Sequence, residues 1–172
     1  MAMNYQAHYP DSPNPKSVED GLKFQDFMMD WLRKEGIFFS SYVSRDYQYK
    51  KGESPQRIEI KFDQDCSNTG RLSVEVAERS STKIQLWTPS GIFRDDNAWW
   101  YIQGNYTIAY LFNKNTLKEY FLGIRHKETQ KKFGTIETFY MGLRDAERLC
   151  VHKFLAEIPG QYKLFGPMRI KA

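Results

Sequence analysis

The sequence predicts an α/β or α+β protein in which helices flank a central mixed sheet. Three observations support this class: an amphipathic helical pattern near the N-terminus, two segments in which apolar and polar residues alternate, and paired strands followed by a helix in the second half. At 172 residues the chain fits one domain, residues 1–172, with a sizeable core. Its hydrophobic content of 41% and aromatic content of 16% are typical of a packed globular protein.

The first expected element is a helix. Residues 1–16 contain three prolines and are expected to form an irregular lead-in. Ser17 and Asp20 have the spacing of a capping box, which begins a helix. An apolar stripe at helical spacing follows and consists of Phe24, Phe27, Met28 and Trp31. Gly36 is placed to end this helix.

Three strands are expected after the helix. Residues 37–49 are rich in aromatic and small side chains, and residues 52–55 are typical of a turn. In residues 58–63 every second residue is apolar and the others are Glu59, Lys61 and Asp63. This is the period of a half-buried strand, so one face enters a core and the other presents charges. Residues 64–70 form a polar turn, and residues 72–78 alternate again with Glu75 on the polar face.

The second half of the chain predicts further strands and helices. Residues 79–98 read as a connecting region. Residues 99–103 and 106–112 are expected to be strands joined at Gly104-Asn105, and Asn113 can cap a short helix over 116–121. Residues 138–143 predict a late strand. Asp145 is expected to begin a helix that continues to about residue 157 and ends before Pro159-Gly160.

Composition excludes several classes of protein. No apolar run approaches the ~18 to 20 residues of a membrane span. The N-terminus lacks the basic start and apolar stretch of a secretory signal, so we expect a cytoplasmic protein. Cys66 and Cys150 are far apart and the three histidines are scattered, which predicts idle thiols and no zinc site. Any metal should therefore be a hard cation bound by oxygen.

The charge balance is compatible with a polyanionic partner. The chain has 25 basic and 21 acidic residues, a net charge of +4. Candidate phosphate-binding residues lie beside the 52–55 turn and in a later basic stretch: Lys50, Lys51, Arg57, Lys127, Lys131 and Lys132. A solvated loop is the alternative explanation for the later stretch.

Acidic residues around this turn suggest a metal site. If Glu53 pairs opposite Glu59 in a hairpin, both carboxylates share one face with Cβ atoms ~5 Å apart. A slip of one residue would place them on opposite faces. Two such carboxylates repel unless a cation lies between them, and Mg²⁺ takes one or two carboxylates together with waters and phosphate oxygens. Lys61, on the face of Glu59, could assist the metal's water or neutralise charge on a phosphate.

These residues resemble a known family. Gly52-Glu53, five intervening residues and Glu59-Ile60-Lys61, after a helix and before a third strand, are similar to the PD-(D/E)XK nuclease superfamily, which is restriction-endonuclease-like and includes Holliday-junction resolvases. The resemblance covers residues 18–112, an αβββ core, and leaves residues 113–172 as a C-terminal elaboration. It implies an enzyme that binds Mg²⁺ or Mn²⁺ and hydrolyses phosphodiester bonds of DNA.

The resemblance assigns roles to particular residues. It implies that Glu53 and Glu59 bind the metal together with the backbone carbonyl of Ile60, and that Lys61 is the catalytic lysine. Some members add an acid from the first helix, for which Asp20 or Asp26 is available. Gly-Glu stands where the family usually has Pro-Asp, and the gap to Glu59 is short. Asp46, which twelve residues separate from Glu59, is therefore the rival first acid.

Two functions remain open from the sequence. The first is a Mg²⁺-dependent DNA endonuclease acting on branched or damaged DNA, with Glu75 or Asp20 tuning the site; a homodimer would place two such sites near two strands. The second is a noncatalytic nucleic-acid-binding or assembly protein that keeps a degenerate nuclease-like fold. Convergence of Glu59, Lys61 and either Glu53 or Asp46 in a concave site would favour the enzyme.

Overall fold

A computed structural model of the protein describes residues 15–38, 40–42, 51, 54–124 and 130–156. Its helices are α1 (Pro15–Lys34), α3 (Cys66–Thr69), α4 (Lys114–Ile124) and α5 (Leu143–Leu149), with a 3₁₀ turn η1 (Gly91–Phe93). Its strands are β1 (Ile58–Phe62), β2 (Arg71–Glu78), β3 (Thr88–Pro89), β4 (Trp100–Gly104), β5 (Ile108–Asn113), β6 (Gln130–Phe133), β7 (Ile136–Gly142) and β8 (His152–Leu155).

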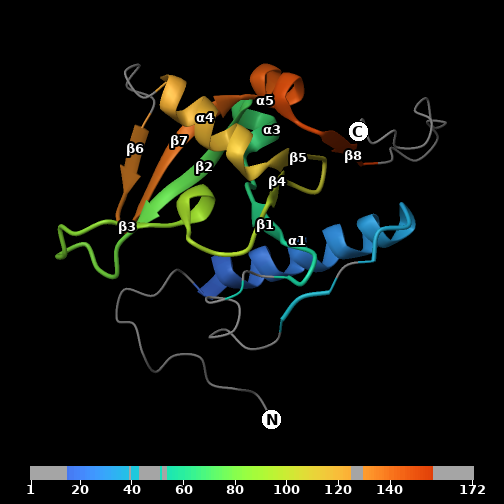
Figure 1. Ribbon diagram of the computed structural model, residues 1–172, viewed down its shortest axis with the longest axis horizontal. Coiled ribbons are helices and arrows are strands. Elements are labelled where there is room, and N and C mark those ends of the chain that lie inside the picture. Colours follow the sequence, from blue (N-terminus) through green and yellow to red (C-terminus); the bar gives the residue numbers. More distant parts are fainter. Residues whose placement is uncertain (1–14, 39, 43–50, 52–53, 125–129, 157–172) are drawn as a thin grey trace, which may run out of the picture.

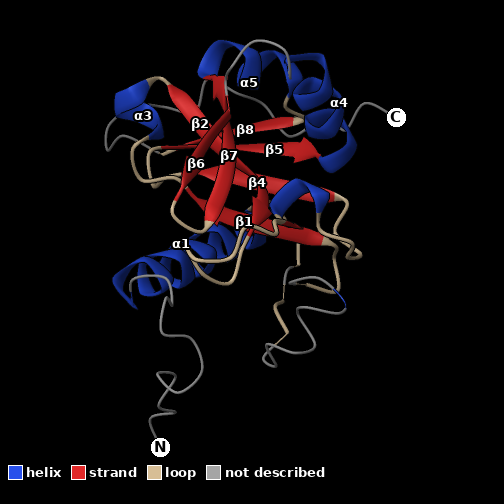
Figure 2. Cartoon of the chain, turned by 90° about the vertical axis from the view of Figure 1, so that its left-hand side faces the viewer, coloured by secondary structure: helices blue, strands red, loops and turns tan. Residues whose placement is uncertain are grey.

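The described strands form two four-stranded sheets. The first has the order β1-β4-β5-β8 and is mixed, because β1 runs parallel to β4 while the other pairs are antiparallel. The second has the order β3-β2-β7-β6 and is antiparallel throughout. In both views α1 lies on one side of the strands, and α4 and α5 lie on the other (Figures 1 and 2). The predicted class, a mixed sheet flanked by helices, is confirmed.

One core lies between α1 and the first sheet. Helix α1 buries the side chains of Phe24, Met28 and Leu32, which recur at helical spacing. They pack with Ile58 and Ile60 of β1 and with residues of the neighbouring strands, namely Ile102, Ala109 and Phe154. The predicted apolar stripe of the first helix and the apolar face of β1 therefore meet each other.

A second core joins the two sheets to α4 and α5. Strand β2 contributes Leu72, Val74 and Val76, which are almost fully buried, as the alternation over residues 72–78 predicts. Buried partners from the other elements complete it: Tyr101, Tyr110, Phe112, Leu117, Phe121, Phe139, Met141 and Ala146. Within the described residues, no helix combines the length and apolar character that crossing a bilayer requires.

Several predicted elements need correction. Helix α1 begins at Pro15, a residue that is favourable in a first turn, so Ser17 lies inside the helix and not at its cap. Residues 37, 38 and 40–42 are not in a strand, and the rest of the expected 37–49 strand lies largely outside the described residues. The strands at 58–62 and 71–78 belong to different sheets, so they do not form the expected meander.

The end of the described chain also differs from the prediction. Helix α5 ends at Leu149, and residues 152–155 form strand β8 where a helix to about residue 157 was expected. Strand β8 pairs antiparallel with β5, and Phe154 enters the core under α1. The predicted hairpin over 99–112 is confirmed as β4 and β5, and so is a helix after Asn113, whose Oδ1 accepts a hydrogen bond from the Asn115 amide at 2.9 Å.

Candidate functional site

Strand β1 presents its charged residues on the face turned away from α1. Because side chains alternate along a strand, burial of Ile58 and Ile60 against α1 turns Glu59 and Lys61 to the opposite face. The parallel register aligns Glu59 with Tyr101 and Lys61 with Gln103 of β4. The charged face of the sequence prediction is therefore an interior face of the molecule.

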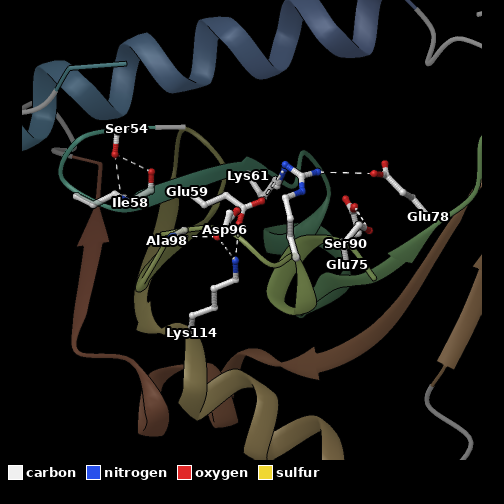
Figure 3. Close-up of polar contacts among 11 residues, drawn as sticks. Ser54, Ile58, Glu59, Lys61, Glu75, Glu78, Ser90, Asp96, Ala98 and Lys114 are labelled. Carbon is white, nitrogen blue, oxygen red and sulfur yellow. Dashed lines mark hydrogen bonds and ion pairs between the residues drawn. The ribbon is translucent and has the colours of Figure 1, made fainter. Parts of the chain in front are cut away.

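Glu59 lies in a buried ion-pair network. Its side chain is 1% exposed, and Lys61 Nζ is 3.0 Å from its Oε1. Lys114 Nζ, reaching Glu59 from the start of α4, is 3.4 Å from Oε2 and 2.9 Å from Oδ1 of Asp96 (Figure 3). The side chains of Lys114 and Asp96 are 3% and 2% exposed. Buried charges of this kind persist only when they are paired, so each member depends on the others.

Backbone hydrogen bonds fix the two distant members of this network. The Lys114 amide donates to the Trp99 carbonyl at 2.8 Å, which ties the start of α4 to the loop before β4. In that loop Asp96 Oδ1 accepts a hydrogen bond from the Ala98 amide at 2.9 Å as well as from Lys114 Nζ. Asp96 and Lys114 are thereby held at the places where they can reach each other.

The network keeps Glu59 ionised. Burial would raise the pKa of its carboxyl, but the positive charges of Lys61, Lys114 and Arg94 outweigh that effect and hold the pKa below its ordinary value. Of the two lysines that pair with Glu59, Lys61 is the more accessible, with 25% of its side chain exposed against 3% for Lys114. It is therefore the member best able to meet a ligand.

Lys61 also lines a pocket of about 280 Å³ between the two sheets. Acidic and amide side chains line the same pocket: Asp63, Asp65, Glu75 and Gln103. Glu75 comes from β2, on the polar face that the alternation predicts. The pocket thus brings Lys61 together with an acid from a second sheet.

Glu75 is held by the turn that precedes η1. The buried Ser90 Oγ donates to Glu75 Oε1 at 2.5 Å, and the Ser90 amide donates to the carbonyl of Val76 at 3.1 Å. Gly91 follows with φ +51°, and a Cβ there would overlap the backbone of Glu75, so only glycine fits. The register of β2 against β7 shifts between Glu75 and Ala77, an irregularity of the kind that redirects a side chain.

A polar wall completes the pocket. Asp63 Oδ2 accepts a hydrogen bond from the Ser73 amide at 2.7 Å, and Gln103 Nε2 donates to the Ser73 carbonyl at 2.7 Å. Burial raises the pKa of the Asp63 carboxyl. The Oε1 atom of Gln103 is buried without a hydrogen-bond partner among the described residues, although this residue is only 3% exposed.

The other predicted site residues divide into two groups. Glu53, Asp46, Lys50 and Lys127 lie outside the described residues, so the expected hairpin pairing of Glu53 with Glu59 stays a prediction. Asp20 and Asp26 lie on α1. Since α1 packs on the face of β1 opposite Glu59, these two acids are on the other side of the sheet.

Ile60 and the described basic residues of the prediction lie in separate parts of the structure. Ile60 is aligned with Ile102 in the middle of the β1–β4 ladder. Lys51 and Arg57 are exposed, and Arg57 directly precedes β1. Lys131 and Lys132 lie in β6 of the other sheet.

The donor chemistry of the described site suits Mg²⁺ in part. Mg²⁺ takes one or two carboxylates and completes its shell with waters and phosphate oxygens. Glu59 and Glu75 are carboxylates of this type, one paired with Lys61 and one in the same pocket as Lys61. Among the described residues, no group of three or more His, Cys, Asp or Glu side chains is arranged to hold a metal ion.

Sequence reasoning missed Asp96, Lys114 and Ser90. Asp96 and Lys114 lie 37 and 55 positions after Glu59, by subtraction of the residue numbers, in stretches read as a loop and a helix start. Lys114 at the start of α4 gave one weak indication of its role. A positive charge is unfavourable at the N-terminus of a helix, so a lysine there suggests a negatively charged partner elsewhere.

Comparison of this chain with models of protein families, with curated proteins and with solved structures finds no match.

Proposed function

We propose that the protein is a Mg²⁺-dependent DNA endonuclease with a restriction-endonuclease-like core of the PD-(D/E)XK type. The observation that supports this proposal best is the Glu59–Lys61 pair, 3.0 Å apart on one strand, with Lys61 at a pocket that also contains Glu75. An acid, a lysine two residues later and a second acid from another strand are the groups that this hydrolysis uses. Mn²⁺ is expected to replace Mg²⁺.

Each residue has a proposed role in this chemistry. Glu59 and Glu75 would bind the metal with the backbone carbonyl of Ile60, and Glu53 or Asp46 would supply the first acid. When bound, the metal would polarise a phosphate oxygen and lower the pKa of a water molecule. The ammonium of Lys61 would neutralise negative charge that develops on the phosphate. Lys114 and Asp96 would hold Glu59 in place.

The experiment is a cleavage assay on supercoiled plasmid, linear duplex and four-way-junction DNA with Mg²⁺, Mn²⁺ or a chelator. We expect cleavage that requires metal and that Lys61→Ala, Glu59→Gln and Glu75→Gln each reduce by two orders of magnitude or more. Lys23→Ala is the matched control, because Lys23 is an exposed lysine on α1 paired with Glu19. Circular dichroism should show that all variants remain folded.

Cleavage at the wild-type rate in Lys61→Ala would show that this strand is not the catalytic element. Loss of cleavage in Lys61→Ala together with full activity in Glu75→Gln would support the proposed role of Lys61. It would exclude Glu75 as the second carboxylate that binds the metal.

A noncatalytic nucleic-acid-binding or assembly protein is the second candidate, and one observation favours it. The two carboxylate oxygens of Glu59 are each within 3.4 Å of a lysine, and the side chain is 1% exposed. A metal at Glu59 would have to compete with these ammonium groups. DNA binding without metal-dependent cleavage of any of the three substrates would support this candidate.

A further inference from the structure

Trp99 differs from the other three tryptophans of the chain in its exposure. Its side chain is 60% exposed, whereas Trp31, Trp87 and Trp100 are half-buried. Tryptophan is on average one of the more deeply buried residues, and the exposed indole of Trp99 leaves a flat apolar surface accessible to another molecule.

Trp99 carries a guanidinium on its ring. The Cζ atom of the exposed Arg57 lies 5.2 Å from the centroid of the Trp99 ring, within the range of a cation–π contact. Arg57 has φ +61° and is the single non-glycine residue of the described chain with positive φ. Such a backbone is strained, and strain of this kind concentrates at ligand-binding positions.

The strained backbone of Arg57 is what fixes Trp99. The Arg57 carbonyl accepts hydrogen bonds from the amides of Trp99 and Trp100 at 2.8 and 3.0 Å. The Trp99 carbonyl in turn accepts the hydrogen bond from the amide of Lys114. Backbone hydrogen bonds thus join Arg57 to Trp99, and Trp99 to Lys114, the lysine that pairs with Glu59.

We propose that Trp99 and Arg57 form a stacking subsite for an unpaired nucleobase, so that the substrate is DNA containing a single-stranded segment. This inference rests on the proposed function, because the ligand of a DNA nuclease carries both a base and a phosphate. An indole offers a flat apolar surface for any base, and an arginine can stack on that surface and also bind a phosphate oxygen. Within a duplex both faces of every internal base are already stacked, so only the terminal base pairs offer the free face that Trp99 requires.

The test measures the affinity of the full chain for a fluorescein-labelled 12-nucleotide oligo(dT) and for a blunt duplex of equal length, in chelator so that cleavage is absent. Trp99→Ala should weaken oligo(dT) binding on the order of tenfold, the effect of one lost base stack, and change duplex binding much less. Trp99→Phe should retain most of the affinity, and Arg57→Lys should lose part of it. Quenching of tryptophan fluorescence by oligo(dT) should be reduced in Trp99→Phe.

Trp87 provides the matched control, because Arg79 lies over its ring in a second Arg–Trp pair with a distance of 4.7 Å. Trp87→Ala should bind oligo(dT) as the wild type does. If the wild-type protein binds DNA and Trp99→Ala binds oligo(dT) equally tightly, the stacking subsite is overturned. The proposed nuclease activity is not affected by that result. Wild-type protein that binds neither DNA form at low salt would overturn both. A tenfold loss in Trp99→Ala together with full cleavage in Lys61→Ala would support the subsite and contradict the catalytic proposal.

Discussion

Lys114 brings a positive charge into the interior, where it serves two carboxylates at once. Its Nζ is within 3.4 Å of an oxygen of Glu59 and within 2.9 Å of an oxygen of Asp96. Removing one partner of a buried ion pair destabilises a protein far more than replacing the whole pair. The remaining charge stays buried, where neither a partner nor water compensates it.

Lys114→Met should therefore destabilise the protein by about 3 to 5 kcal/mol at pH 7. The sign of the pH dependence follows from the lowered pKa of Glu59. A carboxyl with a lowered pKa in the folded state stabilises above its unfolded pKa, and this contribution is lost as the pH falls through the folded value. The difference in the free energy of unfolding between variant and wild type should thus hold from pH 7 to about 4.5, the ordinary value for Glu, and narrow below it in urea denaturation.

The exposed Lys23 is the control for this measurement, because its pair with Glu19 lies on the surface of α1. Lys23→Met should leave the urea midpoint nearly unchanged. An equal cost of Lys114→Met at pH 7 and pH 3 would mean that the lysine acts through packing of its methylene groups and not through charge.

The secondary-structure elements show which parts of the chain can be read locally. The alternation of residues 58–62 identified β1 and the shared face of Glu59 and Lys61, because a period of two is a local property. Strand β8 could not be found in this way. Residues 152–155 form a strand because the β5 backbone pairs with them and because Phe154 fills the core under α1, both of which are tertiary effects.

Strand β8 also contains a histidine that should make stability depend on pH. The His152 ring packs against Phe154 with a centroid distance of 4.6 Å, and burial lowers its pKa although Glu35 acts in the opposite direction. The unfolded chain therefore binds a proton at a higher pH than the folded chain does. The free energy of unfolding should fall as the pH decreases through the ordinary histidine value of about 6.5.

His152→Gln should remove this part of the pH dependence between pH 7 and pH 5. The comparison of variant and wild type isolates His152, because contributions of the other two histidines are common to both proteins. Thermal denaturation followed by circular dichroism at several pH values measures the effect. Parallel pH profiles for the two proteins would contradict it.

At the scale of the whole molecule, the candidate site depends on elements that are far apart in sequence. Glu59, Lys61 and Glu75 could be predicted because each stands on the polar face of an alternating strand. Asp96 and Lys114 could not, because only the folded chain brings the start of α4 and the loop before β4 to β1. The first acid stays a prediction, as Glu53 and Asp46 lie outside the described residues.

The net charge of +4 predicts how the molecule should bind DNA if the proposed function holds. Binding to duplex should weaken with salt with a slope of about −0.9 per phosphate contacted in a plot of log K against log salt concentration. Lys51→Ala, at an exposed predicted phosphate contact, should make the slope shallower by about that amount. DNA-binding titrations at four salt concentrations measure this slope. An unchanged slope in Lys51→Ala would show that Lys51 does not contact a phosphate.

The two cysteines have a practical consequence for studying the protein. Cys66 is buried and burial raises the pKa of its thiol to about 11, while burial also raises the pKa of the half-buried Cys150 thiol. Thiolates are the species that react with maleimides, so both native thiols should react slowly at pH 7. A cysteine introduced at an exposed position such as Lys51 should therefore accept a fluorophore selectively, and distances to DNA could be measured without first removing the native cysteines.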